Sequence, residues 1–187
     1  MRNGMVLCLM ALVCFVVGGC GDRSEIVLAV NEVPADEAVQ ESDGWRSLFD
    51  GESLAGWRGY GMDGLPAGWS VVEGEIHFAA PEEGERADLM TEEQFENFEL
   101  SFEWAVTAGG NSGVFFHVSE GHNRSYETGA EYQLLDNGGH RDGEKPITSA
   151  GSNYALQAPS ADVTLPIGEF NESRLVVNGD HIEHWMN

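Results

Sequence analysis

Residues 98–104 read Phe98-Glu99-Leu100-Ser101-Phe102-Glu103-Trp104, and their pattern indicates the fold class. Apolar and polar side chains alternate along the whole stretch, which is the period of a β-strand with one buried face. The four apolar side chains therefore face a core, while the two glutamates and the serine face away from it. Such alternation is typical of an antiparallel sheet and not of a helix.

Other short segments repeat this signal between turn residues. Further strands are expected at residues 69–72, 75–78, 113–118, 131–136, 173–177 and 181–186. The pairs Glu73-Gly74 and Asn178-Gly179 supply hairpin turns between such segments. Helix signals are confined to residues 91–95, which could form one turn with Thr91 as its cap. Repeated short strands with glycine-rich turns predict an all-β protein built as a β-sandwich.

The composition is that of a folded and strongly acidic protein. The chain has 187 residues, enough for one domain with a core, and 42% of them are hydrophobic. Nine Lys and Arg against 32 Asp and Glu give a net charge of −23. This charge repels phosphate, so we expect neither nucleic-acid binding nor electrostatic adsorption to anionic lipid. Charge alone does not distinguish a solvated surface from carboxylates that bind a sugar or a cation.

The first residues have the organisation of a secretory leader. Arg2 precedes an uncharged apolar run, Met5 to Val17, which is too short to span a bilayer but suits a signal-peptide core. The run ends in Val17-Gly18-Gly19-Cys20, which resembles the lipobox of bacterial lipoproteins and implies cleavage before Cys20 and its lipidation. An ordinary signal peptide is the alternative. We expect a leader at 1–19, an acidic tether at 20–43 with a short strand near 26–30, and a β-sandwich domain at 44–187.

Polar residues within the apolar strands are the candidates for chemistry. Glu131 and Gln133 are two residues apart on one strand and share a face, and Asp136 ends that strand. Two carboxylates and an amide on one surface suit sugar hydroxyls, a cation or acid–base catalysis, although a solvated sheet face would look the same. Glu103 joins this group if its sheet neighbours the Glu131 strand. His117 is notable because it lies inside an apolar strand.

A glycine-rich turn at residues 109–113 precedes another apolar strand. Its Asn111 and Ser112 could present polar groups to a ligand at the rim of a sheet. The His-x-x-His spacing at 181–184 falls on a strand, so a helical zinc-protease site is not available. The sequence contains neither a phosphate-binding loop, nor a dinucleotide fingerprint, nor a nucleophile-elbow motif.

Together these motifs resemble a bacterial domain family, the 3-keto-disaccharide hydrolases or 3-keto-glucoside lyase/hydratases. Residues 48–57, Leu-Phe-Asp-Gly-Glu-Ser-Leu-Ala-Gly-Trp, are similar to the family's opening signature. The similarity continues at 69–74, 98–100, 103–104, 111–113, 131–136, 150–154 and 184–187. It implies a concanavalin-like jelly-roll β-sandwich. Family members continue beyond the Trp-x-Asn of 185–187 with more strands, so we expect a domain truncated at its C-terminus.

The resemblance implies chemistry on a sugar that is oxidised at C3. A ketone at C3 acidifies the C2 proton, so a base can remove it and the C1 substituent can leave; water then adds to the product. This reaction needs a base, an acid and a group that stabilises the enolate, which a divalent cation could supply. The catalytic candidates are Glu131 as base or cation ligand, Asp136 as its partner, and Glu103 and His117 as secondary acid–base groups. The candidates for substrate binding are Asn111, Gln133 and Tyr154.

The expected protein is therefore a lipoprotein of the bacterial cell envelope that acts on 3-keto-glycosides. Its domain would face the periplasm or the exterior, held to the membrane through the lipid on Cys20 alone. Two other hypotheses remain open from the sequence. The domain could be a sugar-binding module without catalysis, because jelly rolls serve both purposes, or a structural envelope protein without a ligand.

Overall fold

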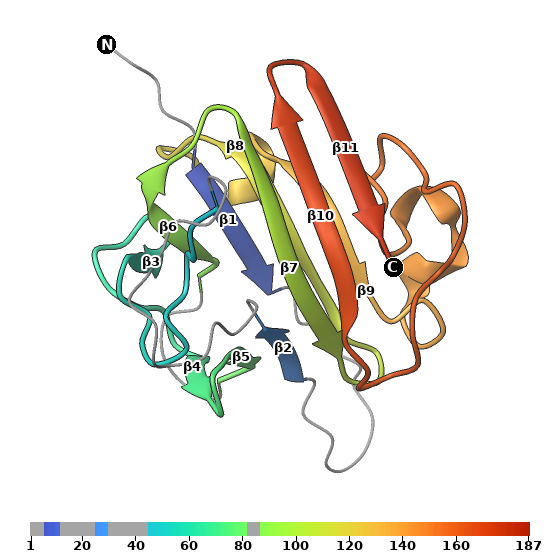
Figure 1. Cartoon of the computed structure of the whole chain (residues 1–187), viewed down its shortest axis with the longest axis horizontal. Helices are drawn as coiled ribbons and strands as arrows, with labels where there is room; N and C mark the ends of the chain where they lie inside the picture. Colours follow the sequence, from blue (N-terminus) through green and yellow to red (C-terminus); the bar gives the residue numbers. More distant parts are fainter. Residues whose placement is uncertain (1–5, 12–24, 30–44, 82–86) are drawn as a thin grey trace.

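Two antiparallel sheets pack face to face in the computed structural model, which describes residues 6–11, 25–29, 45–81 and 87–187 (Figure 1). The five-stranded sheet has the order β3 (Trp57–Gly59), β6 (Leu89–Gln94), β1 (Val6–Ala11), β8 (Asn111–Val118) and β9 (Ala130–Leu135). The six-stranded sheet has the order β11 (His181–Met186), β10 (Asn171–Asn178), β7 (Phe98–Val106), β2 (Glu25–Ala29), β5 (Glu75–Ala79) and β4 (Trp69–Val72). The prediction of an all-β jelly-roll sandwich is confirmed.

The alternating segment that predicted the fold is β7, in the middle of the six-stranded sheet. Phe102 and Trp104 point into the core, where the Phe102 ring meets the Tyr132 ring of β9 edge to face at 5.6 Å. Trp104 is fully buried, and its indole N–H donates to the Ser173 hydroxyl at 2.9 Å. This bond satisfies the one polar group that the ring carries into the core. The two sheets are thus joined through aromatic side chains.

Both predicted hairpins are present. The β4–β5 turn has Glu73 at φ 53° and Gly74 at φ 87°, and the primed turns that join twisted antiparallel strands require such positive values. The β10–β11 connection follows Asn178, with Gly179 at φ 59°. The turn expected at residues 91–95 is wrong, because Thr91 lies within β6, opposite Trp57. Leu89 and Met90 are completely buried there, and burial outweighs the local preference for a capped turn.

The predicted leader and tether lie mostly outside the described residues, and Cys20 is among those outside. The strand expected near residues 26–30 is β2, which pairs with β5 and β7. The apolar run assigned to the leader contains β1, which pairs with β6 on one side and β8 on the other. In the described part of the chain, no helix is long and apolar enough to cross a membrane.

Three 3-10 turns, η1 (Ser125–Glu127), η2 (Arg141–Glu144) and η3 (Pro146–Thr148), flank β9. The turns η2 and η3 belong to residues 137–154, which fold back along the free edge of β9. Backbone bonds fix this return: Gly151 N–H donates to the Gln133 carbonyl at 2.8 Å, and Tyr154 N–H donates to the Glu131 carbonyl at 3.0 Å. The return therefore brings residues 137–154 beside β9 (Figure 1).

Candidate active site

Glu131 is the central carboxyl group of the face of the five-stranded sheet that points away from the other sheet. Its neighbours Tyr132 and Leu134 point into the core, so the alternation of β9 turns Glu131 and Gln133 outward. We call this outward surface of β8 and β9 the Glu131 face. Gln133 is 1% exposed and Asn111 is 6% exposed, so the Glu131 face is covered and is not a solvated one. The sequence-based alternative of a solvated face is therefore wrong for β9.

The environment of Glu131 favours its neutral form. Burial, together with the nearby carboxylates of Asp88 and Asp142, raises the pKa of the carboxyl to about 8. Among the described residues, none donates a hydrogen bond to the Glu131 carboxyl. Without such donors or a cationic partner, the charged form is poorly stabilised. Glu131 therefore holds a proton at neutral pH.

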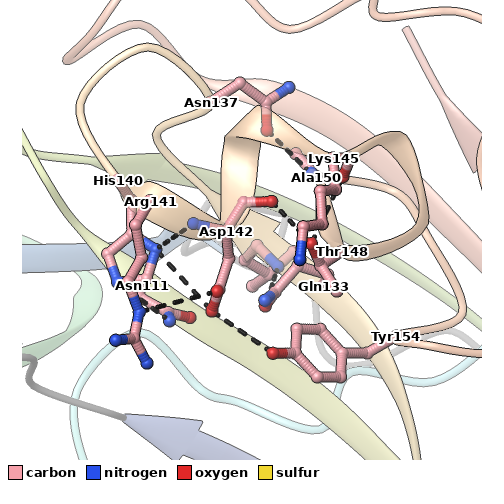
Figure 2. A network of polar contacts seen from close by, with 11 residues as sticks. Asn111, Gln133, Asn137, His140, Arg141, Asp142, Lys145, Thr148, Ala150 and Tyr154 are labelled. Carbon is pink, nitrogen blue, oxygen red and sulfur yellow. Dashed lines mark hydrogen bonds and ion pairs between the residues drawn. The ribbon is translucent and has the colours of Figure 1, made fainter.

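Polar side chains of residues 137–154 form a network that reaches Asn111 of β8 (Figure 2). Asp142 of this network is close enough to Glu131 to act on its pKa. The Tyr154 hydroxyl donates to the Asp142 carboxylate at 3.2 Å. The backbone N–H of Asp142 donates to Nδ1 of His140 at 3.2 Å, and Nε2 of His140 lies 3.5 Å from the side-chain amide of Asn111. Burial and the Asp142 carboxylate raise the pKa of Tyr154, so its hydroxyl remains a donor. The network thus joins η2, β8 and the return along β9.

Asp136 holds two loops together. Its carboxylate accepts from the backbone N–H of Gly109 at 2.7 Å and from that of Gly138 at 3.0 Å. Gly109 lies in the turn that leads into Asn111, and Gly138 lies in the turn that leads into His140. Asp136 was predicted as the chemical partner of Glu131, and the structure engages both of its oxygens with these backbone amides. Its observed role is to fix the positions of the two loops.

The other two catalytic candidates are Glu103, in the opposite sheet, and His117, on β8. Glu103 is on β7 in the six-stranded sheet and points outward between the buried Phe102 and Trp104, so the sandwich separates it from Glu131. The condition under which it was expected to join Glu131 is not met. His117 has φ 60° at an irregularity of β8, and its ring packs on Phe116. Its Nε2 is buried and has no hydrogen-bond partner within the described part of the chain.

The structure also places three residues at the site that the sequence did not single out as site residues. Asp88 precedes β6 and accepts from the Ser125 hydroxyl, and its pKa is raised by burial. His140 and Asp142 come from η2 and its cap. His140 and Asp142 lie in an irregular segment, so no strand or helix period in the sequence could identify them. The one available signal was the turn-rich Asn137-Gly138-Gly139 after an apolar strand, which predicts that the chain reverses there.

The carboxylates do not form a cation site. Among the described residues, no group of three or more His, Cys, Asp or Glu side chains is arranged to hold a metal ion. Glu131 and Asp136 were the two expected ligands, but both Asp136 oxygens already accept backbone hydrogens. We therefore derive no step through a metal.

A separate cavity of about 350 Å³ lies between β11 and residues 150–163. His184 lines it, with Nδ1 at 3.2 Å from the Gly151 carbonyl and with the pKa of the ring lowered by burial. Glu131 does not line this cavity. No carboxyl group lines this cavity. The Glu131 face is therefore the better candidate for acid–base chemistry.

Comparison with known proteins agrees with the sequence motifs and the fold. A curated relative from Bacteroides thetaiotaomicron, named 3-keto-disaccharide hydrolase, is 33% identical over 178 residues, which cover 86% of this chain and 61% of the relative. The crystal structure of "a putative glycosyl hydrolase" from Parabacteroides distasonis superposes with a TM-score of 0.68 at 32% identity, covering 75% of this chain and 67% of that one. Residues 44–187 match the 3-keto-alpha-glucoside-1,2-lyase-like domain. The chain belongs to this domain family.

Proposed function

We propose that this protein cleaves 3-keto-glycosides, by elimination and hydration or by hydrolysis, with Glu131 as the residue that transfers a proton. The observation that carries the proposal is a carboxyl with a pKa of about 8 on a covered polar face. A carboxyl whose pKa lies near the working pH is suited to proton transfer, and perturbed groups of this kind gather at active sites. The names of the relatives, a 3-keto-disaccharide hydrolase and a putative glycosyl hydrolase, support the substrate class.

In the elimination route, the ketone at C3 makes the C2 proton acidic. A base removes that proton, the electrons form a C1–C2 double bond, and the C1–O bond breaks. The departing oxygen takes a proton, which the neutral carboxyl of Glu131 can supply, and water then adds across the new double bond. The Asp142 carboxylate, which accepts from Tyr154 and is close enough to Glu131 to act on its pKa, is proposed as the base.

The direct test is turnover of a sugar that carries the ketone. Purified protein is mixed with 3-keto-trehalose, and the release of free monosaccharide is followed against unoxidised trehalose. We expect release from the keto-sugar only. The Glu131→Gln variant keeps the size of the side chain and loses the proton, so release should fall by about 100-fold or more. Glu172→Gln, an exposed glutamate on β10, is the matched control and should match the wild-type rate.

Failure of the folded wild-type protein to release sugar would reject this proposal. If calorimetry then showed binding of the same sugar by both wild type and Glu131→Gln, the domain would be a carbohydrate-binding module. If neither protein bound the sugar, a structural role in the envelope would remain.

We also propose that the protein is held in the bacterial cell envelope by a lipid on Cys20, because the lipobox-like sequence directly follows an apolar run. Expression in a bacterial host with a radiolabelled fatty acid tests this. Label should enter the wild-type protein and not the Cys20→Ser variant. Unlabelled wild-type protein in the soluble fraction would contradict the anchor.

A further inference from the structure

The hydrogen bonds of His140 fix the position of its ring proton. Nδ1 accepts from the backbone N–H of Asp142 at 3.2 Å, and a backbone amide can act only as a donor. Nδ1 therefore carries a lone pair, and the proton of the neutral ring sits on Nε2. The Asp142 carboxylate lies farther from Nδ1, at 3.8 Å, beyond hydrogen-bonding distance. The amide contact therefore determines the tautomer.

The tautomer in turn orients Asn111. As placed, Nδ2 of Asn111 lies 3.5 Å from Nε2 of His140, so two N–H groups would face each other if Nε2 carries the proton. A protonated Nε2 is a donor, so it repels the NH2 group of Asn111 and pairs with the amide oxygen instead. A flip of the amide about its last bond exchanges these two ends and brings Oδ1 to His140. With Oδ1 turned to His140, the NH2 group takes the other position. Asn111 is 6% exposed, and neither end of its amide is among the buried polar atoms that lack a partner in the described part of the chain, so the second position is open to a ligand on the Glu131 face.

This NH2 group lies on the face where the substrate is expected. Asn111 and Gly113 are two residues apart on β8 and share the face of Glu131, and Gly113 is in direct contact with the Glu131 side chain. A repeat of two residues along a strand is roughly 7 Å, which a sugar ring can bridge. Asp136 also fixes the position of Asn111 relative to His140, because its carboxylate binds the turns that lead into these two residues.

We propose that His140 holds Asn111 as a hydrogen-bond donor to the ketone oxygen of the substrate, where negative charge develops as the C2 proton leaves. This role rests on the proposed function. His140 is then a positioning residue, and Asn111 contacts the substrate. A donor aimed at an oxygen that gains charge binds the enolate more strongly than the ketone, so it acts on kcat more than on KM.

Two variants separate the steps of this proposal. In Asn111→Asp, one oxygen still accepts from His140, but the NH2 donor becomes a second oxygen. In His140→Asn, the shorter side chain can still accept from the Asp142 N–H as a cap, but the Nε2–H is lost. Both variants should lower kcat for 3-keto-trehalose by about 100-fold, with KM changed by less than about threefold and with the thermal midpoint kept. Glu172→Gln is the control.

Nitrogen-15 NMR of the wild-type protein without substrate tests the orientation alone. His140, assigned by its loss in His140→Asn, should show the neutral ring protonated on Nε2 at pH 7. A ring protonated on Nδ1 would overturn the proposal, as would Asn111→Asp retaining the wild-type kcat. An inactive wild-type protein with the expected tautomer would reject the proposed function and the role of Asn111 with it, while the His140–Asn111 contact would stand as structural.

Discussion

Gly113 of β8 lies directly under the carboxyl of Glu131 on β9. A methyl group added at Gly113 would overlap Oε1, Cγ and Cδ of Glu131. The two strands are adjacent, with Gly113 opposite Gln133 and Phe115 opposite Glu131, so the Glu131 side chain crosses diagonally over the bare backbone of Gly113. Because Gly113 has no side chain, the Glu131 carboxyl can pack against the surface of the sheet, where burial raises its pKa.

Gly113→Ala should therefore displace the carboxyl with little effect on the fold. The overlapping atoms belong to the flexible end of a glutamate, which can rotate away at small cost, so the thermal midpoint should change by no more than about 3 °C. Release of sugar from 3-keto-trehalose should fall by at least about tenfold, because the proton donor is misplaced. Gly64→Ala is the control: a methyl group there meets nothing within 4 Å. Full activity in Gly113→Ala would show that the position of Glu131 is unimportant.

The raised pKa of Glu131 makes a prediction for stability. Unfolding returns the pKa of the carboxyl from about 8 to its ordinary value near 4.5. Between these values the folded state binds more protons than the unfolded state, so this group lowers the free energy of unfolding as pH rises from 4.5 to 8. Glutamine cannot ionise, so Glu131→Gln should be more stable than wild type by on the order of 2–3 kcal/mol at pH 7 and nearly equal to it at pH 4.5.

Urea unfolding of both proteins from pH 4.5 to 9 measures this effect. All other carboxyls are shared by the two proteins and cancel in the difference between their unfolding free energies. A difference that does not grow with pH would mean that the Glu131 pKa is not raised in the folded protein.

The same pKa sets the alkaline limit of activity. If neutral Glu131 supplies the proton to the leaving oxygen, kcat/KM should be lost as pH rises through about 8, with a tenfold loss per pH unit beyond it. Tyr154 stays protonated over this range, because its pKa is raised above its ordinary value, and so it adds no second break. The profile is measured with 3-keto-trehalose from pH 6 to 10. A rate that rises through pH 8 would make Glu131 the base.

The sequence predicted the parts of the site that follow a regular period, and missed the parts that come from irregular chain. Strand alternation placed Glu131 and Gln133 on one face of β9, whereas Asn111 was named only as a polar residue of a glycine-rich turn and lies at the start of β8. The sequence did not predict that these residues lie near His140 and Asp142, because that proximity depends on the return of residues 137–154 along β9. Glu103 was misplaced for the same reason: alternation gives its face within a strand, but which strands share a sheet is set by long-range pairing.

A substitution at Asp136 tests whether its carboxylate has a structural or a catalytic role. In Asp136→Asn, the side chain can accept from only one of the amides of Gly109 and Gly138 with its oxygen, and its NH2 group opposes the other. An unsatisfied amide costs about 1–3 kcal/mol, so the thermal midpoint should fall by several degrees. Hydrogen exchange at Gly109 and Gly138 should accelerate. Loss of activity without loss of stability would instead restore the catalytic role first expected for Asp136.

The strand β1 gives the last prediction, because a cleaved leader and a strand at Val6–Ala11 cannot belong to the same mature molecule. With β1 in place, β6 and β8 each pair with it along one edge. Removal of residues 1–19 takes that partner away, and a strand edge that has lost its partner exposes amides to solvent exchange. A chain that starts at residue 20 should therefore exchange backbone hydrogens faster in β6 and β8 than the full chain does. Exchange in β10, which pairs with β7 and β11, should remain unchanged and is the internal control. Equal protection of β6 and β8 in both chains would mean that β1 contributes nothing to the sheet, which is the result expected if the apolar run serves only as a leader.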